Sequence, residues 1–129
     1  MRPRRTIHEL LEEYRSHIDR VAPEDVEAIV DAGGVVVDTR DTADRTAEGV
    51  IPGSVHLPLS VLPWRADPDS EHRDPGVSDL DKPMIIVCND GYSSSWAAAT
   101  LVDMGFTQVG DLVGGHRGWV RSGRPVEHP

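Results

Sequence analysis

The sequence contains one cysteine, few positively charged side chains and no long apolar segment. Because Cys88 is the only cysteine among 129 residues, no disulfide can form within the chain, and folding does not require an oxidising compartment. Asp and Glu number 22 against 13 Lys and Arg, which gives a formal net charge of −9, and no block of Lys or Arg is present. This charge balance makes nucleic acids and anionic membranes poor partners, and we expect neither.

The N-terminal region has no continuous apolar core of the kind found in signal peptides. Three early arginines are followed by acidic residues from Glu9 onward, and no later stretch is long and apolar enough to span a bilayer. The six histidines show no metal-ligand spacing, and one cysteine does not make a zinc site. We therefore expect a cytoplasmic protein that needs no metal and no cofactor.

Short apolar runs alternate with helical patterns through most of the chain. Strands are predicted where β-branched and apolar residues run together, and helices where apolar residues recur at intervals of three or four. The predicted strands are 35–40, 55–57, 83–88 and 106–115, and the predicted helices are Thr6–Val21, 22–34, 94–104 and 116–123, with a further helix-like stretch beginning at 42. Strands that are apolar throughout and alternate with helices predict an α/β fold with a mostly parallel open sheet and helices on both faces.

The length suits one domain with its own hydrophobic core. We expect residues 1–21 to form an N-terminal helical extension and residues 22–129 to form the domain itself. The segment 58–83 is rich in Pro and Asp, so it is predicted to be a long surface excursion with little regular structure. Trp96 and Trp119 are expected to pack on helix faces.

The stretch "VCNDGYSSSWAAA" places Cys88 at the end of the most apolar strand and just before a helix. In open parallel sheets, ligands bind beyond the carboxyl ends of the strands. A free thiol, with a pKa near ~8.5, is mostly protonated at neutral pH, but the N–H groups of a helix N-terminus favour an anion. Gly91 allows the loop to curl, so that the amides from Asn89 to Ser94 converge above the sulfur. The alternative is that Cys88 is a small buried core residue.

Several motifs, in order, resemble those of the single-domain rhodanese-like sulfurtransferases, from about residue 22 to residue 126. Asp38-Thr39-Arg40 fits the family's D-x-R, and "GVIPGS" fits its G-H-I-P-G-A with Val50 in place of histidine. "CNDGYSS" fits the C-x-x-G-x-[RT]-S active loop, and "LVGGHRGW" fits the late G-G-x-x-x-W.

This resemblance implies a sheet of about five strands and a catalytic Cys88. The cysteine would take a sulfane sulfur from a donor such as thiosulfate or a persulfide, and would pass it from its own persulfide to a thiol, to cyanide or to a sulfur-accepting protein. With no second cysteine in the chain, the acceptor has to be external. The resemblance implies that the substrate contacts come from the loop that follows the cysteine, namely Asn89, Asp90, Gly91, Tyr92, Ser93 and Ser94.

The loop departs from the family pattern because it carries Asp90 and no Arg or Lys. If the Asp90 carboxylate faces the pocket, it repels an anionic donor and disfavours the thiolate. If it points to solvent or accepts the loop's own amides, as Asp commonly does in turns, it has no such effect. The acidic loop therefore argues against thiosulfate as the physiological donor, but it does not argue against persulfide chemistry at Cys88.

Residues outside the loop have two interpretations each. Arg65, next to Trp64 in the 58–83 excursion, either supplies the missing cation or is simply solvated. His116 either approaches Cys88 or is an ordinary surface or hydrogen-bonded histidine. Asp38 and Arg40 are expected to be structural residues near the site, with Arg40 paired to a carboxylate such as Glu48 or Asp44.

Three functions are compatible with the sequence. The first is a sulfurtransferase that uses Cys88, and the second is a non-catalytic rhodanese-like module that binds a partner or senses sulfide or oxidants. The third is a cysteine phosphatase, a class that shares the fold. A phosphatase loop needs an arginine six positions after the cysteine to bind phosphate with two hydrogen bonds, and this position holds Ser94.

Overall fold

The computed structural model describes residues 2–129, in which five parallel strands form one sheet in the order β1-β5-β4-β2-β3. The strands are β1 (Asp19–Val21), β2 (Val35–Asp38), β3 (Val55–His56), β4 (Met84–Val87) and β5 (Val109–Leu112). The helices are α1 (Ile7–Ser16), a 3-10 turn η1 (Pro23–Asp25), α2 (Val26–Asp31), α3 (Thr42–Glu48), α4 (Leu62–Ala66), α5 (Ser93–Asp103) and α6 (Gly115–Arg121). The predicted α/β fold is confirmed.

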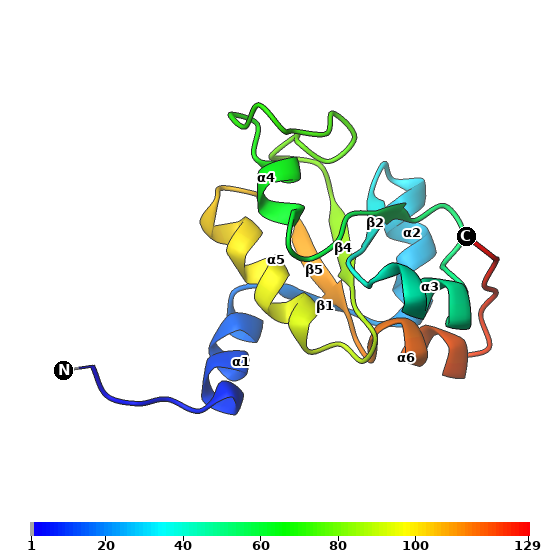
Figure 1. Cartoon of the computed structure of the whole chain (residues 1–129), viewed down its shortest axis with the longest axis horizontal. Helices are drawn as coiled ribbons and strands as arrows, with labels where there is room; N and C mark the ends of the chain where they lie inside the picture. The colour runs from blue at the N-terminus through cyan, green and yellow to red at the C-terminus, as the bar shows by residue number, and fades with distance from the viewer. Residues whose placement is uncertain (1) are drawn as a thin grey trace.

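Helices cover both faces of the sheet (Figure 1). Helices α1, α4 and α5 lie on one side, and α2, α3 and α6 lie on the other. Side chains alternate along each strand, so that Ile86 of β4 packs with α4 and α5, whereas Ile85 packs with α2 and α6. All four residues of β4 are buried, which explains why this strand is the most apolar run in the sequence.

The predicted helix from Thr6 to Val21 is too long. Helix α1 begins at a capping box in which Thr6 and Glu9 bond each other's backbone N–H groups, and it ends at Ser16. Residues Asp19–Val21 instead form β1, which pairs with β5 at the edge of the sheet. Gly110 permits this pairing, because a Cβ atom there would lie 2.4 Å from the Asp19 carbonyl oxygen.

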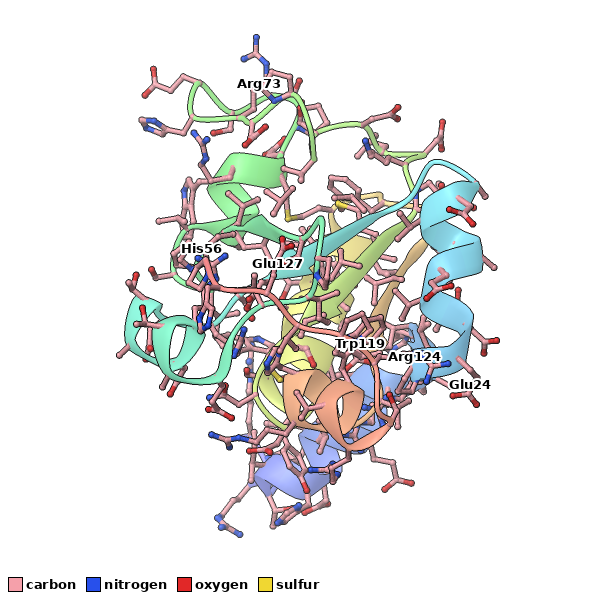
Figure 2. All side chains as sticks on the ribbon, turned by 90° about the vertical axis from the view of Figure 1, so that its right-hand side faces the viewer. Glu24, His56, Arg73, Trp119, Arg124 and Glu127 are labelled. Atoms are coloured by element: carbon pink, nitrogen blue, oxygen red, sulfur yellow. The ribbon has the colours of Figure 1, made fainter. Side chains whose placement is uncertain are left out.

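The excursion at 58–83 contains a helix that the sequence pattern did not predict. Helix α4 places Leu62 and Ala66 in the core, and Val77 further along is also fully buried. The rest of the excursion is turns that lead directly into Met84 at the start of β4, so it lies at the end of the sheet where that strand begins. Arg73 of the excursion lies at the top of the molecule in Figure 2, well away from Trp119 of α6.

The segment after α6 packs over the side of the sheet that carries α2 and α6. Trp119 is buried and donates from Nε1 to the Pro125 carbonyl over 2.8 Å, with the Arg124 guanidinium beside its ring (Figure 2). Further on, Glu127 forms a bridge with Val50. No helix among residues 2–129 is long and apolar enough to cross a membrane.

Candidate active site

Cys88 directly follows β4, and its side chain lines a cavity of about 320 Å³ at the carboxyl ends of the strands. Its side chain is only slightly exposed, at 6% for the residue. The cavity is lined by Thr39, Arg40, Asp41, Asp44, Cys88, Asn89, Asp90, Tyr92 and Ser93. Every loop residue predicted for substrate binding except Gly91 and Ser94 therefore faces this Cys88 cavity, and those two contact the sulfur instead.

The loop curls around the sulfur as predicted, with two of its backbone N–H groups donating to Sγ. The donor-to-sulfur distance is 3.1 Å from Gly91 N and 3.4 Å from Ser94 N. The curl requires Gly91 at φ +89°, a backbone angle that other residues resist. A Cβ atom there would lie 3.0 Å from the backbone nitrogen of Gly114, so both the angle and the close packing demand glycine.

Helix α6 supports the loop from the other side. The N–H groups of His116 and Arg117 donate to the carbonyls of Cys88 and Asn89 over 2.8 and 3.1 Å. Gly115 makes this approach possible, because a Cβ atom on it would lie 2.6 Å from the carbonyl oxygens of both loop residues. The G-G dipeptide of the late motif therefore holds the Cys88 loop against α6.

A buried polar cluster lies beneath the sulfur. The thiol donates to Ser94 Oγ over 3.2 Å, and the hydroxyls of Ser94 and Ser95 each donate to Asp111 Oδ2 over 2.8 Å. Arg20 donates from Nε to Asp111 Oδ1 over 3.1 Å. The sequence pattern did not single out Asp111, although a carboxylate inside the buried strand "VGDL" is a signal that could have done so.

Two arginines from the N-terminal segment also hold the loop. Arg15 and Arg20 donate to the Gly91 carbonyl over 2.8 and 3.2 Å, and the Arg15 guanidinium lies over the Tyr92 ring. No sequence spacing relates these arginines to a loop some 70 positions later, so only the fold brings them together.

Asp90 lines the cavity, but its carboxylate is held by a partner that the sequence did not suggest. Arg117 of α6 donates to Asp90 over 2.8 Å and also makes two 3.0 Å hydrogen bonds with Glu48. These contacts hold the pKa of the Glu48 carboxyl below its ordinary value and raise the pKa of the Arg117 guanidinium above its own. Within residues 2–129, no loop amide donates to the Asp90 side chain.

Arg40 pairs with a carboxylate as predicted, but its partner is Asp38 and not Glu48 or Asp44. It donates through Nε and Nη2 to the two carboxylate oxygens over 3.1 and 2.9 Å, and both side chains are buried. Burial tends to raise the pKa of Asp38, but the hydrogen bonds from Arg40 and Arg45 outweigh it, and the pKa of Asp38 is lowered. The pair is near in sequence, and the D-x-R spacing places both charges on one buried turn. Asp44 instead accepts from the Asn89 side chain over 3.0 Å.

Arg65 does not supply a cation to the Cys88 cavity. It donates to the His72 carbonyl and the Asp74 carboxylate within the excursion, at the opposite end of the sheet. Its neighbour Trp64 is exposed because α4 points Leu62 and Ala66 inward and turns its other face to solvent.

His116 is fully buried, and the structure confirms the hydrogen-bonded alternative. Its Nε2 lies 3.0 Å from the Glu48 carbonyl oxygen, and burial lowers the pKa of the imidazole. No group of three or more potential ligands within residues 2–129 could hold a metal ion.

An apolar groove adjoins the Cys88 cavity. It has a volume of about 590 Å³ and is lined by Ile7, His8, Leu11, Tyr14, Tyr92, Ser93 and Trp96. Tyr92 and Ser93 line both hollows, so the two are neighbours. Trp119 packs in the core, whereas Trp96 is 50% exposed on α5 and forms a wall of this α1–α5 groove.

The comparisons with known proteins agree with this geometry. The rhodanese-like domain family matches residues 22–122. The chain belongs to this family. The thiosulfate sulfurtransferase GlpE of Stutzerimonas stutzeri is a relative with 41% identity, over 78% of this chain and 83% of that protein. The resemblance noted in the sequence is thereby confirmed.

Solved rhodanese-like structures share the fold. A Rhodopseudomonas palustris protein of unknown function, described as a possible tyrosine phosphatase, superposes with a TM-score of 0.87 and 32% identity over 98% of both chains. A thiosulfate sulfurtransferase from Pseudomonas aeruginosa gives 0.75 and 27% over 92% of this chain and 22% of its own length. The superposition with the Rhodopseudomonas palustris protein covers 98% of this chain, so it extends over α1 and β1 as well as the residues that the family model matches.

Proposed function

We propose that this protein is a rhodanese-type sulfurtransferase that carries a sulfane sulfur as a persulfide on Cys88. The observation that carries the proposal is the cradle of N–H groups from Gly91 and Ser94 around Sγ. Such donors stabilise negative charge on sulfur without having to reorganise during the reaction. The family and its GlpE relative support the same chemistry.

The reaction consists of two nucleophilic displacements at sulfur. The Cys88 thiolate attacks the sulfane sulfur of the donor, a sulfur–sulfur bond forms, and the donor's remaining part leaves with the electron pair of the broken bond. The acceptor then attacks the outer sulfur of the persulfide, and Cys88 departs as the thiolate. Because the chain has no second cysteine, the acceptor comes from outside. The need for a free thiol fits the cytoplasm.

The charges around the Cys88 cavity favour a donor of low negative charge. Asp41, Asp44 and Asp90 line it, and the one cation among the lining residues, Arg40, is already paired with Asp38. The thiosulfate dianion therefore meets a repulsive rim, although the GlpE relatives are named for that donor. We propose that a persulfide of an organic thiol is the better donor and that thiosulfate is a weaker one.

The α1–α5 groove favours a thiol with an apolar body as acceptor. The groove is apolar, shares Tyr92 and Ser93 with the Cys88 cavity and is within the size range of ligand pockets. An acceptor that lays its apolar part against Trp96 would bring its thiol past Tyr92 toward Cys88. Cyanide is too small to use this surface and is expected to serve as acceptor without it.

A phosphatase is disfavoured by Ser94, which stands where a phosphate-binding arginine is needed and is itself buried against Asp111. The test measures thiocyanate formed from either sulfur donor and cyanide, and hydrolysis of an aryl phosphate, with wild type and Cys88→Ser. We expect sulfur transfer only with the wild type and phosphatase activity with neither. Phosphate release without thiocyanate would overturn the proposal. A wild-type protein whose Cys88 reacts slowly with iodoacetamide, and which transfers no sulfur, would favour the non-catalytic rhodanese-like module.

A further inference from the structure

Asp111 is a buried carboxylate that the two displacements do not use. It lies in β5, between core residues, with no exposed surface. A buried carboxylate is stable only when it is paired and hydrogen-bonded, and Asp111 has three partners: Arg20 on Oδ1, and the hydroxyls of Ser94 and Ser95 on Oδ2. Two of these partners stay away from the sulfur, and the third touches it.

Ser94 joins the buried carboxylate to Cys88. Its oxygen accepts the thiol hydrogen over 3.2 Å while its own hydrogen is donated to Asp111 over 2.8 Å. A hydroxyl group has one hydrogen and two lone pairs. In this arrangement the lone pairs face the sulfur, which suits a thiol and opposes a thiolate.

We propose that Ser94 is a hydroxyl switch, whose hydrogen points to Asp111 when Cys88 is a thiol and turns to Sγ when Cys88 is a thiolate or a persulfide. In neither of the latter forms does Sγ itself carry a hydrogen, so Sγ can only accept a hydrogen bond. The turned hydroxyl adds a third donor to the N–H groups of Gly91 and Ser94. In forming the thiolate the proton leaves to solvent through the Cys88 cavity, and none is transferred to Asp111.

The second serine makes the switch possible. When Ser94 turns away, Asp111 keeps the Ser95 hydroxyl on Oδ2 and the Arg20 guanidinium on Oδ1, so the carboxylate is not left unpaired. Asp111 is thus a positioning residue that holds the hydroxyl hydrogen until the sulfur needs it. The other charged groups around the loop are Arg15, which donates to the Gly91 carbonyl and to Ser95 Oγ, and Asp90, which is bound by Arg117. Arg40, Asp41 and Asp44 line the Cys88 cavity on the side of α3.

Ser94 and Ser95 form a matched pair for the test. Both hydroxyls donate to the same Asp111 oxygen over the same distance, and only Ser94 contacts Sγ. Ser94→Ala and Ser95→Ala therefore remove equal support from Asp111, but only Ser94→Ala removes a donor from the sulfur. The measurement is the rate of Cys88 alkylation by iodoacetamide across a range of pH, with thermal unfolding of each variant as the check on folding.

We expect Ser94→Ala to react about tenfold more slowly near neutral pH, because one hydrogen bond to a charged group is lost. Its rate should meet that of the wild type at high pH, so that the whole profile moves upward in pH. Ser95→Ala should stay within about twofold of the wild type at every pH. Equal slowing in both variants, or a Ser94→Ala profile that coincides with the wild type, would overturn the switch.

This inference deepens the proposed sulfurtransferase function and can fail separately from it. Alkylation needs no sulfur donor or acceptor, so it reports on the thiolate alone. A shifted Ser94→Ala profile in a protein that never gains a persulfide would keep the switch and reject the sulfur transfer. An unshifted profile in a protein that transfers sulfur would do the reverse.

Discussion

Gly91 shows how one residue serves two demands at once. Its positive φ aims the N–H group at the sulfur, and its missing side chain lets the loop rest on Gly114. The first demand could be predicted from the spacing of Cys88 and Gly91, because a curl between a strand and a helix needs such an angle. The second could not, because Gly114 lies 23 positions later and reaches the loop only through the fold.

Gly91→Ala is expected to lower sulfur transfer by at least about tenfold and to cost about 1–3 kcal/mol of the free energy of unfolding. The new Cβ would push the loop away from Gly114 and draw the N–H group off Sγ. Gly53→Ala is the control, because Gly53 also has a positive φ but nothing lies within 4 Å of its Cβ position. Urea unfolding and thiocyanate formation should show a stability loss in both variants and an activity loss in Gly91→Ala alone. Normal transfer by Gly91→Ala would refute the cradle.

Asp90 is a residue whose environment the sequence left open between two alternatives. The carboxylate lines the Cys88 cavity, as one alternative held, but it is also paired with Arg117, which lies 27 positions away on α6. Local sequence could not reveal that partner, because no spacing rule connects a loop residue to a residue of a later helix. The pairing reduces the repulsion that the carboxylate exerts without removing it from the rim.

Asp90→Asn should lower the KM for thiosulfate several-fold at low salt, and the gain should shrink as salt screens the rim charges. The KM for an organic persulfide, which carries one negative charge where thiosulfate carries two, should change less. Glu71→Gln, which removes an equally negative but remote and exposed charge, is the control and should leave both values as they are. A higher KM for thiosulfate in Asp90→Asn at both low and high salt would contradict the charge argument.

At the scale of elements, β4 and α5 could be predicted because their own residues determine them. The run at 84–87 is buried on both faces, and α5 places Ala97, Ala98 and Leu101 in the core. Strand β1 could not be predicted, because its three residues become a strand only by pairing with β5. Helix α4 was missed for a similar reason. It lies in a segment rich in turns, and its two buried side chains pack with residues of the sheet and of α5 that are distant in the sequence.

The contact between α1 and α5 leaves a groove whose use can be measured at the acceptor step. Trp96→Ser should raise the KM for a thiol with an aromatic body several-fold, since it removes the apolar wall, while the rate with cyanide should not change. Trp64→Ser is the matched control, because Trp64 is equally an exposed tryptophan but lies on α4, away from both hollows. Equal loss with cyanide and with the thiol would mean that the groove does not bind the acceptor.

At the scale of the whole molecule, the buried His116 ties stability to pH. Its pKa is lowered from 6.5 by burial, so the folded state holds the neutral imidazole more strongly than the unfolded state does. The contribution of His116 to the free energy of unfolding is complete at a pH above 6.5, and it is lost as the pH falls through the lowered pKa of the folded state. Asp38 and Glu48, whose pKa values are also lowered, add a loss of the same sign in more acidic solution.

His116→Gln should flatten the fall in unfolding free energy as the pH drops below 6.5, because glutamine can keep the hydrogen bond to the Glu48 carbonyl without titrating. The exposed His128 provides the control, and His128→Gln should follow the wild-type curve. Urea unfolding at a series of pH values measures the effect. A His116→Gln curve as steep as that of the wild type would show that this histidine does not set the acid sensitivity.

The most direct test of the account is the mass of the intact protein after incubation with a sulfur donor. Wild type treated with an organic persulfide or thiosulfate should gain one sulfur atom, fragmentation should locate it on Cys88, and cyanide should remove it as thiocyanate. Cys88→Ser, which keeps the volume of the side chain but has an alcohol in place of the thiol, should gain nothing. A wild type that gains no sulfur from either donor, or a Cys88→Ser variant that gains it as readily, would contradict the account.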